Sequence, residues 1–320
     1  MEQCLGSDGA LLYLTTRNKV DTYTAYRVLR ESAPAGGGSF VPFQLPVFTE
    51  QQLFQMKELS FSEIVAKTLN LFFGTSISGW DIDFAVGRQV FKLVNMSHRI
   101  FVLESWHNHE GTHECTVSRL YRLLAGEEKM NIAPGGWFYT AVDIAMLFGV
   151  FGQLLRKDIT QFHVAFPAGD LKLLVALRYA QKMGLPISTV ALGADEGEDL
   201  WEFIYHGNYS TRREKLPSGL ESLIYLAFGI NGVKRFLRIA ENKRIYQLSD
   251  DELAVFADGI FASVVGKNRI QNIISSVKRT CNYRISTDTA YAYSALQDCR
   301  VRGTGGQDAV LFSYRKPAEE

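Results

Sequence analysis

Several features that mark large classes of protein are scarce or missing in this sequence. Four of its 320 residues are cysteines, and they are scattered without the CxxC spacing of a disulfide framework or a zinc knuckle. Lysine plus arginine equals aspartate plus glutamate at 34 each, so no net charge favours nucleic acid. The first residues, Met1 to Cys4, show neither the basic flank nor the apolar core expected of a signal peptide, and we find no stretch that approaches the roughly 18 apolar residues of a membrane helix. We therefore expect a cytoplasmic protein that binds neither nucleic acid nor membrane.

The sequence that is present is typical of a globular protein, with 47% hydrophobic and 21% charged residues. An apolar strand at 161–166, a helix at 171–183 and a strand at 187–192 form a predicted β-α-β unit, which implies parallel pairing. The remaining predicted helices cover residues 21–32, 49–57, 60–73, 116–125 and 138–155, and the remaining strands cover 11–16, 99–104 and 309–312. The pattern predicts a layered α/β domain.

One segment of this unit carries a resemblance to a known family. The run YAQKMGLPI at 179–187 is similar to the Y-A-K-K-M-G-L-P-I segment of threonine synthases. Shorter matches follow in the family's order along the chain: TTR at 15–17, GGSFVP at 37–42, STDTA at 286–290 and AVLFS at 309–313. The chain thus resembles a threonine synthase along most of its length.

This resemblance implies the fold type II architecture of pyridoxal-phosphate enzymes, an α/β fold with a three-layer core like that of the tryptophan synthase β subunit. It divides the chain into a threonine synthase-type N-terminal domain at 1–98 and an α/β core at 99–320. The family converts O-phosphohomoserine to threonine. Residues 126–130 stand where the family carries a long segment containing most of a small lobe that covers the cofactor. The resemblance therefore implies that this lobe is largely deleted.

The chain departs from the family at the residues that hold the cofactor. Aligning Trp106 and His107 with the family's F-H puts Glu114 at the lysine that forms the Schiff base, and a carboxylate cannot form an imine. In the family's phosphate loop, Gly169 persists but Asp170 adds a negative charge. Ser313 stands where a hydroxyl contacts the pyridine nitrogen. We expect no catalytic residue and no cofactor, with Gly169, Asp170 and Ser313 as vestiges of the pyridoxal-phosphate site.

A second pattern points to different chemistry. His109, Glu110 and His113 match H-E-x-x-H, in which two imidazoles one helical turn apart bind zinc and the glutamate acts as general base. Asn108 and Gly111 have poor helix propensity, which opposes this interpretation. The segment is a metal site, a solvated or partner-facing loop, or the lining of a remnant cleft.

The sequence thus predicts a threonine synthase-like pseudoenzyme that acts as a binding or partner subunit. The alternative is a metal-dependent enzyme that uses His109, Glu110 and His113. A second alternative is a divergent, active pyridoxal-phosphate enzyme in which another lysine, such as Lys172, carries the imine. The small-molecule or protein partner and the oligomeric state are left open.

Overall fold

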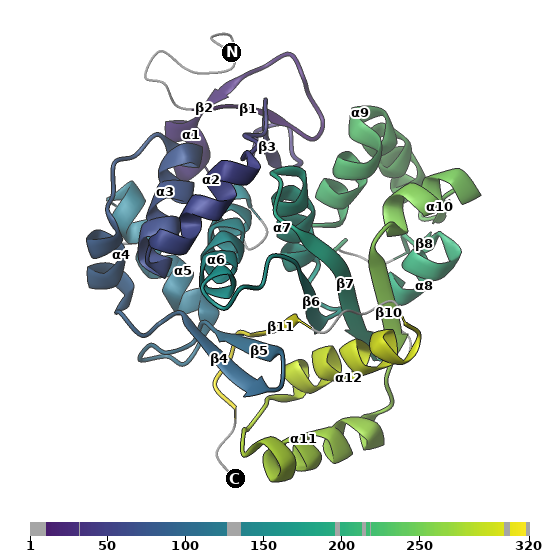
Figure 1. Cartoon of the computed structure of the whole chain (residues 1–320). Helices are drawn as coiled ribbons and strands as arrows, with labels where there is room; N and C mark the ends of the chain where they lie inside the picture. Colours follow the sequence, from purple (N-terminus) through teal and green to yellow (C-terminus); the bar gives the residue numbers. More distant parts are fainter. Residues whose placement is uncertain are drawn as a thin grey trace.

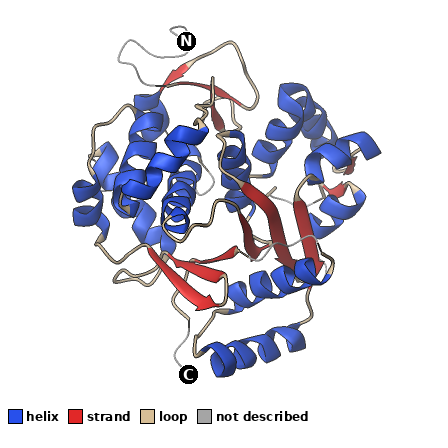
Figure 2. Ribbon diagram, in the orientation of Figure 1, coloured by secondary structure: helices blue, strands red, loops and turns tan. Residues whose placement is uncertain are grey.

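A six-stranded sheet forms the centre of the molecule, in the order β10-β7-β6-β11-β5-β4 (Figures 1 and 2). The computed structural model describes residues 11–31, 33–126, 136–195, 199–212, 216–217, 219–303 and 308–317. The strands are β4 (Lys92–Ser97), β5 (Ile100–Glu104), β6 (Phe162–Pro167), β7 (Ile187–Ala194), β10 (Ile260–Val264) and β11 (Ala309–Ser313). All pairs are parallel except β4 with β5.

The predicted β-α-β unit is confirmed. β6 runs into α7 (Leu171–Lys182) and then into β7, which pairs with β6 in parallel. The strand predicted at 309–312 is also confirmed as β11, and it lies between β5 and β6. β4 and β10 were not predicted. β4 exposes Lys92 and Asn95, whereas β10 is an apolar run that the sequence analysis missed. These two strands form the edges of the sheet.

Alternating side chains of each strand divide the interior into two cores, which makes the molecule three layers thick. In β11, Val310 and Phe312 belong to the larger core, whereas Ala309 and Leu311 belong to the smaller one. The larger core is completed by α3 (Phe61–Phe73), α6 (Trp137–Leu155) and α7. The smaller core is completed by α11 (Lys267–Cys281) and α12 (Thr287–Val301). The fold is thus a mixed α/β fold with helices on both faces of its sheet.

Helix α6 runs through the larger core. Every residue of α6 except Gln153 is buried, and Asp143 is its single charged residue. By length and composition α6 could cross a membrane, which corrects the expectation that no stretch is long and apolar enough. However, 94% of that window is buried inside the protein, as in the core helix of a globular domain. Gly149 allows close packing against α3, since a Cβ there would lie 2.8 Å from Phe61.

The N-terminal part packs helices and a small sheet against α6. The sheet has the order β2-β1-β3 and consists of β1 (Leu12–Thr15), β2 (Tyr23–Thr24) and β3 (Phe40–Pro42). The helices are α1 (Ala25–Arg30), α2 (Glu50–Gln55), a 3-10 turn at Met56–Glu58, α3 and α4 (Gly79–Val86). The helix predicted from residue 21 begins at Ala25, because Tyr23 and Thr24 pair with β1 first. Helix α3 begins at a capping box formed by Ser60 and Glu63.

The remaining elements follow β5 and β7. α5 (His113–Ala125) precedes α6, and α8 (Asp199–His206) follows β7. The others are β8 (Asn208–Ser210), α9 (Leu220–Glu241), β9 (Ile245–Gln247) and α10 (Asp250–Ala257). α5 ends at Ala125 and α6 begins at Trp137, so the deletion predicted around residues 126–130 falls mostly outside the described residues. The division at residue 98 stays a prediction.

Gly193 should be the glycine on which the packing of α12 against β7 depends. A Cβ at this position would lie 2.2 Å from the carbonyl oxygen of Tyr291, a backbone atom that cannot move alone. We expect Gly193→Ala to lower the free energy of unfolding by about 1–3 kcal/mol, measured by urea denaturation. Gly36→Ala is the control, because nothing lies within 4 Å of a Cβ there. Equal stability of Gly193→Ala and the unaltered protein would contradict the packing described here.

Candidate functional site

A cavity of about 390 Å³ lies at the carboxyl edge of the parallel strands. Pro167 ends β6, Gly193 lies near the end of β7 and Phe312 lies near the end of β11, and all three line the cavity. In open α/β sheets, ligands bind outside the carboxyl ends of the strands, where loops and helix starts converge. This cavity is therefore the candidate functional site.

Three helices begin at the cavity, and each brings a carboxylate there. Glu114 lies in the first turn of α5, Asp170 is the N-cap of α7, and Asp288 lies in the first turn of α12. The N-terminus of a helix carries a partial positive charge and unpaired N–H groups, both of which favour an anion. In this chain the anions at all three helix starts are the protein's own side chains.

Asp170 occupies the N-terminus of α7 directly. Its Oδ1 accepts a hydrogen bond from the backbone N–H of Leu173 at 3.3 Å. Burial, and then the negative charge of Asp143, raise the pKa of Asp170 to about 6, whereas Lys172 and His113 oppose the rise. The side chain thus changes its charge near neutral pH.

His113 and Asp143 form a buried pair beside Asp170. His113 Nε2 lies 3.2 Å from Asp143 Oδ1, and each side chain is 6% exposed. This is ion-pair distance without hydrogen-bond geometry, and Nδ1 has no hydrogen-bond partner in the described part of the chain. The imidazole stacks on the ring of Tyr314, with centroids 4.5 Å apart and planes 18° apart. The Tyr314 hydroxyl in turn lies 3.5 Å from Asp143 Oδ1, and burial raises its pKa well above the usual value.

Asp143 is a site residue that the sequence analysis missed. The signal was available, because a single aspartate in an otherwise apolar helix is costly to bury unless it has a partner. The partner could not be predicted, because His113 comes from a different helix.

The residues expected as vestiges of the cofactor site lie in different settings. Gly169 and Asp170 line the cavity, as does Glu114 from the predicted lysine position. Ser313 ends β11 and is buried, and its hydroxyl accepts a hydrogen bond from Trp106 Nε1 at 3.1 Å. Lys172 also lines the cavity, with its ammonium 5.8 Å from the centroid of the Tyr139 ring.

The histidine segment is divided between two places. His109 and Glu110 lie in the loop before α5, whereas His113 is the first residue of α5 and faces Asp143. Asn108 Oδ1 accepts from the backbone N–H groups of Glu110 and Thr112, which fixes the loop conformation. His109 and His113 therefore do not share a helix face, which the H-E-x-x-H geometry requires.

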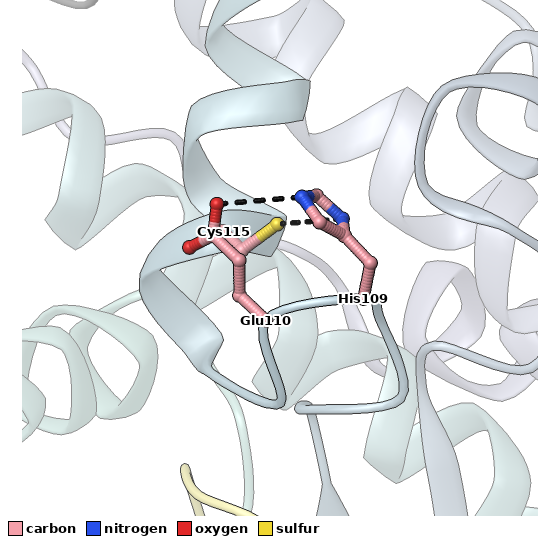
Figure 3. Close-up of side chains that lie close together, drawn as sticks. All are labelled: His109, Glu110 and Cys115. Carbon is pink, nitrogen blue, oxygen red and sulfur yellow. Dashed lines mark hydrogen bonds and ion pairs between the residues drawn. The ribbon is translucent and has the colours of Figure 1, made fainter.

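A different set of side chains gathers around His109. One ligand atom each from His109, Glu110 and Cys115 lie within 4.8 Å of one another (Figure 3). Cys115 Sγ lies 3.7 Å from His109 Nδ1, and Glu110 Oε1 lies 3.4 Å from His109 Nε2. Arg119 Nη2 donates to Nδ1 at 2.7 Å, so the ring proton is on Nε2. Burial raises the pKa of the Cys115 thiol.

Comparisons with known proteins agree with this fold. Residues 12–88 match the family model of the threonine synthase N terminus. The fold is similar to pyridoxal-phosphate-bound threonine synthase from Brucella melitensis, with a TM-score of 0.78, 16% identity, and coverage of 96% of this chain and 89% of that chain. It is also similar to yeast threonine synthase, with a TM-score of 0.79, 14% identity, and coverage of 96% and 87%. No curated protein matches the chain.

These similarities show that the chain has the fold type II architecture of pyridoxal-phosphate enzymes, as predicted. The threonine synthase of Escherichia coli shares this fold, with a TM-score of 0.68, 14% identity, and coverage of 96% of this chain and 89% of that one. Within this fold, residues 12–88 resemble the N terminus of threonine synthases, which confirms the predicted resemblance.

Replacing Asp170 by asparagine should stabilise the protein at neutral pH. Because the pKa of Asp170 rises from 3.8 to about 6 on folding, the native state binds more protons in this range and stability falls as pH rises through it. The full shift corresponds to about 3 kcal/mol, and partial exposure to solvent lowers that figure. Asparagine is neutral and also caps helices well. We expect Asp170→Asn to gain about 1–3 kcal/mol at pH 7.5 and less than about 1 kcal/mol at pH 4.5.

Urea denaturation at both pH values measures this gain. Asp158→Asn is the matched control, because the Asp158 side chain is 92% exposed. A variant at Asp170 that is less stable than the unaltered protein at pH 7.5 would show that the ionised carboxylate stabilises the fold.

Proposed function

We propose that this chain is a threonine synthase-like binding protein without pyridoxal-phosphate catalysis. The observation that carries this proposal is the position of the Asp170 carboxylate on the first turn of α7. By the resemblance, this is the loop that cradles the cofactor's phosphate. A helix N-terminus offers its N–H groups to one anion at a time, and here the anion is already covalently part of the chain.

A phosphate dianion at this place would also meet unfavourable charge. Two unit charges 4 Å apart repel by about 4 kcal/mol at an effective dielectric constant of 20. Asp170 and Asp143 both line the cavity, and Lys172 offsets only part of their charge. The donor set therefore does not fit the phosphate of the cofactor.

The covalent anchor does not fit either. Glu114 lines the cavity at the predicted lysine position, and its carboxylate cannot condense with an aldehyde. Lys172 is a lysine of the cavity wall and is the anchor that the divergent-enzyme alternative requires. Its ammonium lies near the ring of Tyr139 and belongs to a helix whose N-terminus already holds Asp170. These contacts support a role of Lys172 in the wall of a binding cavity rather than as the lysine that forms an imine.

The retained cavity supports a role in binding a small molecule or a protein partner in the cytoplasm. We further propose the division into an N-terminal domain at 1–98 and a core at 99–320. The enzymes named above are threonine synthases. The N-terminal match and the fold therefore support a role in amino-acid metabolism.

Incubation with pyridoxal phosphate tests the proposal. After desalting, we expect no visible imine band. After borohydride reduction, we expect no labelled lysine by peptide mass mapping. We also expect no release of threonine from O-phosphohomoserine, because neither the anchor nor the phosphate cradle is present.

Lys172→Arg serves as the matched variant, since it keeps the charge but cannot form an imine. A retained imine band with one labelled lysine would contradict the proposal. If Lys172 carried the label and Lys172→Arg abolished it, the chain would be a divergent pyridoxal-phosphate enzyme.

A metal-dependent function is the second candidate, and the grouping of His109, Glu110 and Cys115 favours it. Imidazole, carboxylate and thiolate donors together suit zinc, and three protein ligands leave a fourth position open for water. His109 and Glu110 are 64% and 58% exposed, so their side chains can close on an ion. Arg119 opposes the ion because its guanidinium lies against the same imidazole. His113, predicted as a ligand from the sequence, lies outside this group.

Zinc content after purification without added metal tests the second candidate. It predicts about one equivalent of zinc, lost in Cys115→Ser and retained in the control His98→Ala, which alters an exposed histidine of the β4–β5 turn. Arg119→Ala should bind zinc more tightly, because a nearby positive charge is removed. Absence of bound zinc in both the unaltered protein and Arg119→Ala would eliminate this candidate.

A further inference from the structure

We propose that the cavity binds a small organic polycation, an aliphatic di- or polyamine that carries no acidic group. This inference rests on the proposed function, because it names the ligand class of the same cavity. It differs from the phosphate and amino-acid chemistry of the family, since the ligand would have no anionic group.

The charge of the cavity wall is the first argument. Carboxylates that line the cavity come from five segments: Glu114 from α5, Asp143 from α6, Asp170 from α7, Asp195 after β7 and Asp288 from α12. The lining cations are Lys172 and Arg315, together with the imidazole of His113. Carboxylates still outnumber cations when His113 is counted as charged and paired with Asp143.

The orphaned atom of His113 is an independent second argument. His113 is 5% exposed and lines the cavity, and its Nδ1 has no hydrogen-bond partner among the described residues. The other ring nitrogen, Nε2, lies 3.2 Å from the Asp143 carboxylate without hydrogen-bond geometry. A neutral imidazole has one donor nitrogen and one acceptor nitrogen. A buried acceptor without a partner costs free energy that a ligand donor recovers. An ammonium group has three such donors and no acceptor.

Aromatic rings are the third argument. Five of them line the cavity: Tyr139, Phe166, Tyr291, Phe312 and Tyr314. The faces of aromatic rings attract cations, and their edges and faces also accommodate aliphatic chains. Lys172 already places a butyl-ammonium group 5.8 Å from the centre of the Tyr139 ring, so the chain itself contains a cation in this environment.

The volume of the cavity and the charge of its wall together limit the class of ligand. A volume of about 390 Å³ suits a small molecule. The carboxylates come from five separate segments of the chain, so a ligand with two or more ammonium groups can contact more of them than a single point charge does. A flexible aliphatic chain between the ammonium groups would pack against the rings.

Isothermal titration of the full chain with spermidine and with putrescine tests the proposal. In 150 mM salt at pH 7.5 we expect saturable binding of one molecule per chain. Glu114→Gln and Asp288→Asn should each weaken binding by about fivefold or more, because each removes about 1 kcal/mol or more of charge-assisted interaction. Asp158→Asn should leave the affinity unchanged, because Asp158 does not line the cavity and its side chain is 92% exposed.

Affinity should also fall as the pH is lowered through about 6. Asp170 then takes up a proton, and the groups around it are Asp143 on α6, His113 on α5, Lys172 on α7 and Tyr314 after β11. Protonation removes a negative charge from the wall, so a cation binds less tightly. Butylamine should bind more weakly than putrescine, since it carries one ammonium group instead of two.

Three outcomes would overturn the proposal: absence of saturable binding, binding of several molecules per chain, or an affinity that neither cavity variant changes. These failures are distinguishable from failure of the proposed function. A protein that binds no polyamine and also forms no imine with pyridoxal phosphate remains a binding protein with another ligand. A protein that forms the imine refutes both proposals.

Discussion

Positive helix ends converge on the carboxyl edge of the parallel sheet, and the arrangement of the candidate site follows from how this charge is balanced. Helices α5, α7 and α12 all begin there, and the N-terminus of each carries a partial positive charge. A bound anion is one solution. In this chain Glu114, Asp170 and Asp288 supply the negative charge instead. The starts of these helices therefore face carboxylates of the chain itself, although burial makes the ionised form of Asp170 unfavourable.

Because of these carboxylates, the wall of the cavity presents negative charge to a ligand instead of the positive charge of the helix ends. Asp170 caps α7, and the nearby negative charge of Asp143 contributes to its raised pKa. Asp143 Oδ1 in turn contacts both His113 and Tyr314, whose rings stack on each other. Helix N-termini at the carboxyl edge of the sheet favour an anion. Because carboxylates line the cavity there, its wall presents mainly hydrogen-bond acceptors to a ligand. A donor-rich ligand matches this wall better than a phosphate does.

The sequence predicted the fold well where its signals were local. The apolar strand, helix and strand from Phe162 to Ala194 became the parallel unit at the centre of the sheet, and the run at 309–312 became its inner strand β11. The edge strand β4 gave no clear pattern because Lys92 and Asn95 interrupt it, whereas the apolar edge strand β10 was missed although its residues suit a strand. Helix α6 met the length and apolarity of a membrane span, and only the tertiary structure shows that protein surrounds it.

The site was predictable in part. Glu114, Gly169 and Asp170 were identified from the order of motifs, and they do line one cavity. The contact of His113 with Asp143 depends on how α5 packs beside α6, which a sequence pattern does not encode. For the same reason the sequence does not show that the two histidines of the motif lie apart. A loop fixed by Asn108 and a helix cap at Thr112 separate His109 from His113.

The most direct test of this account is whether the Asp170 carboxylate excludes a phosphate from the cavity. Equilibrium dialysis with pyridoxine 5′-phosphate measures this, because the compound has the ring and phosphate of the cofactor but no aldehyde. We predict no binding to the unaltered protein at pH 7.5 and measurable binding to Asp170→Asn, which removes the charge. Micromolar binding to the unaltered protein, equal to that of the variant, would contradict the claim that the carboxylate has taken the place of the anion.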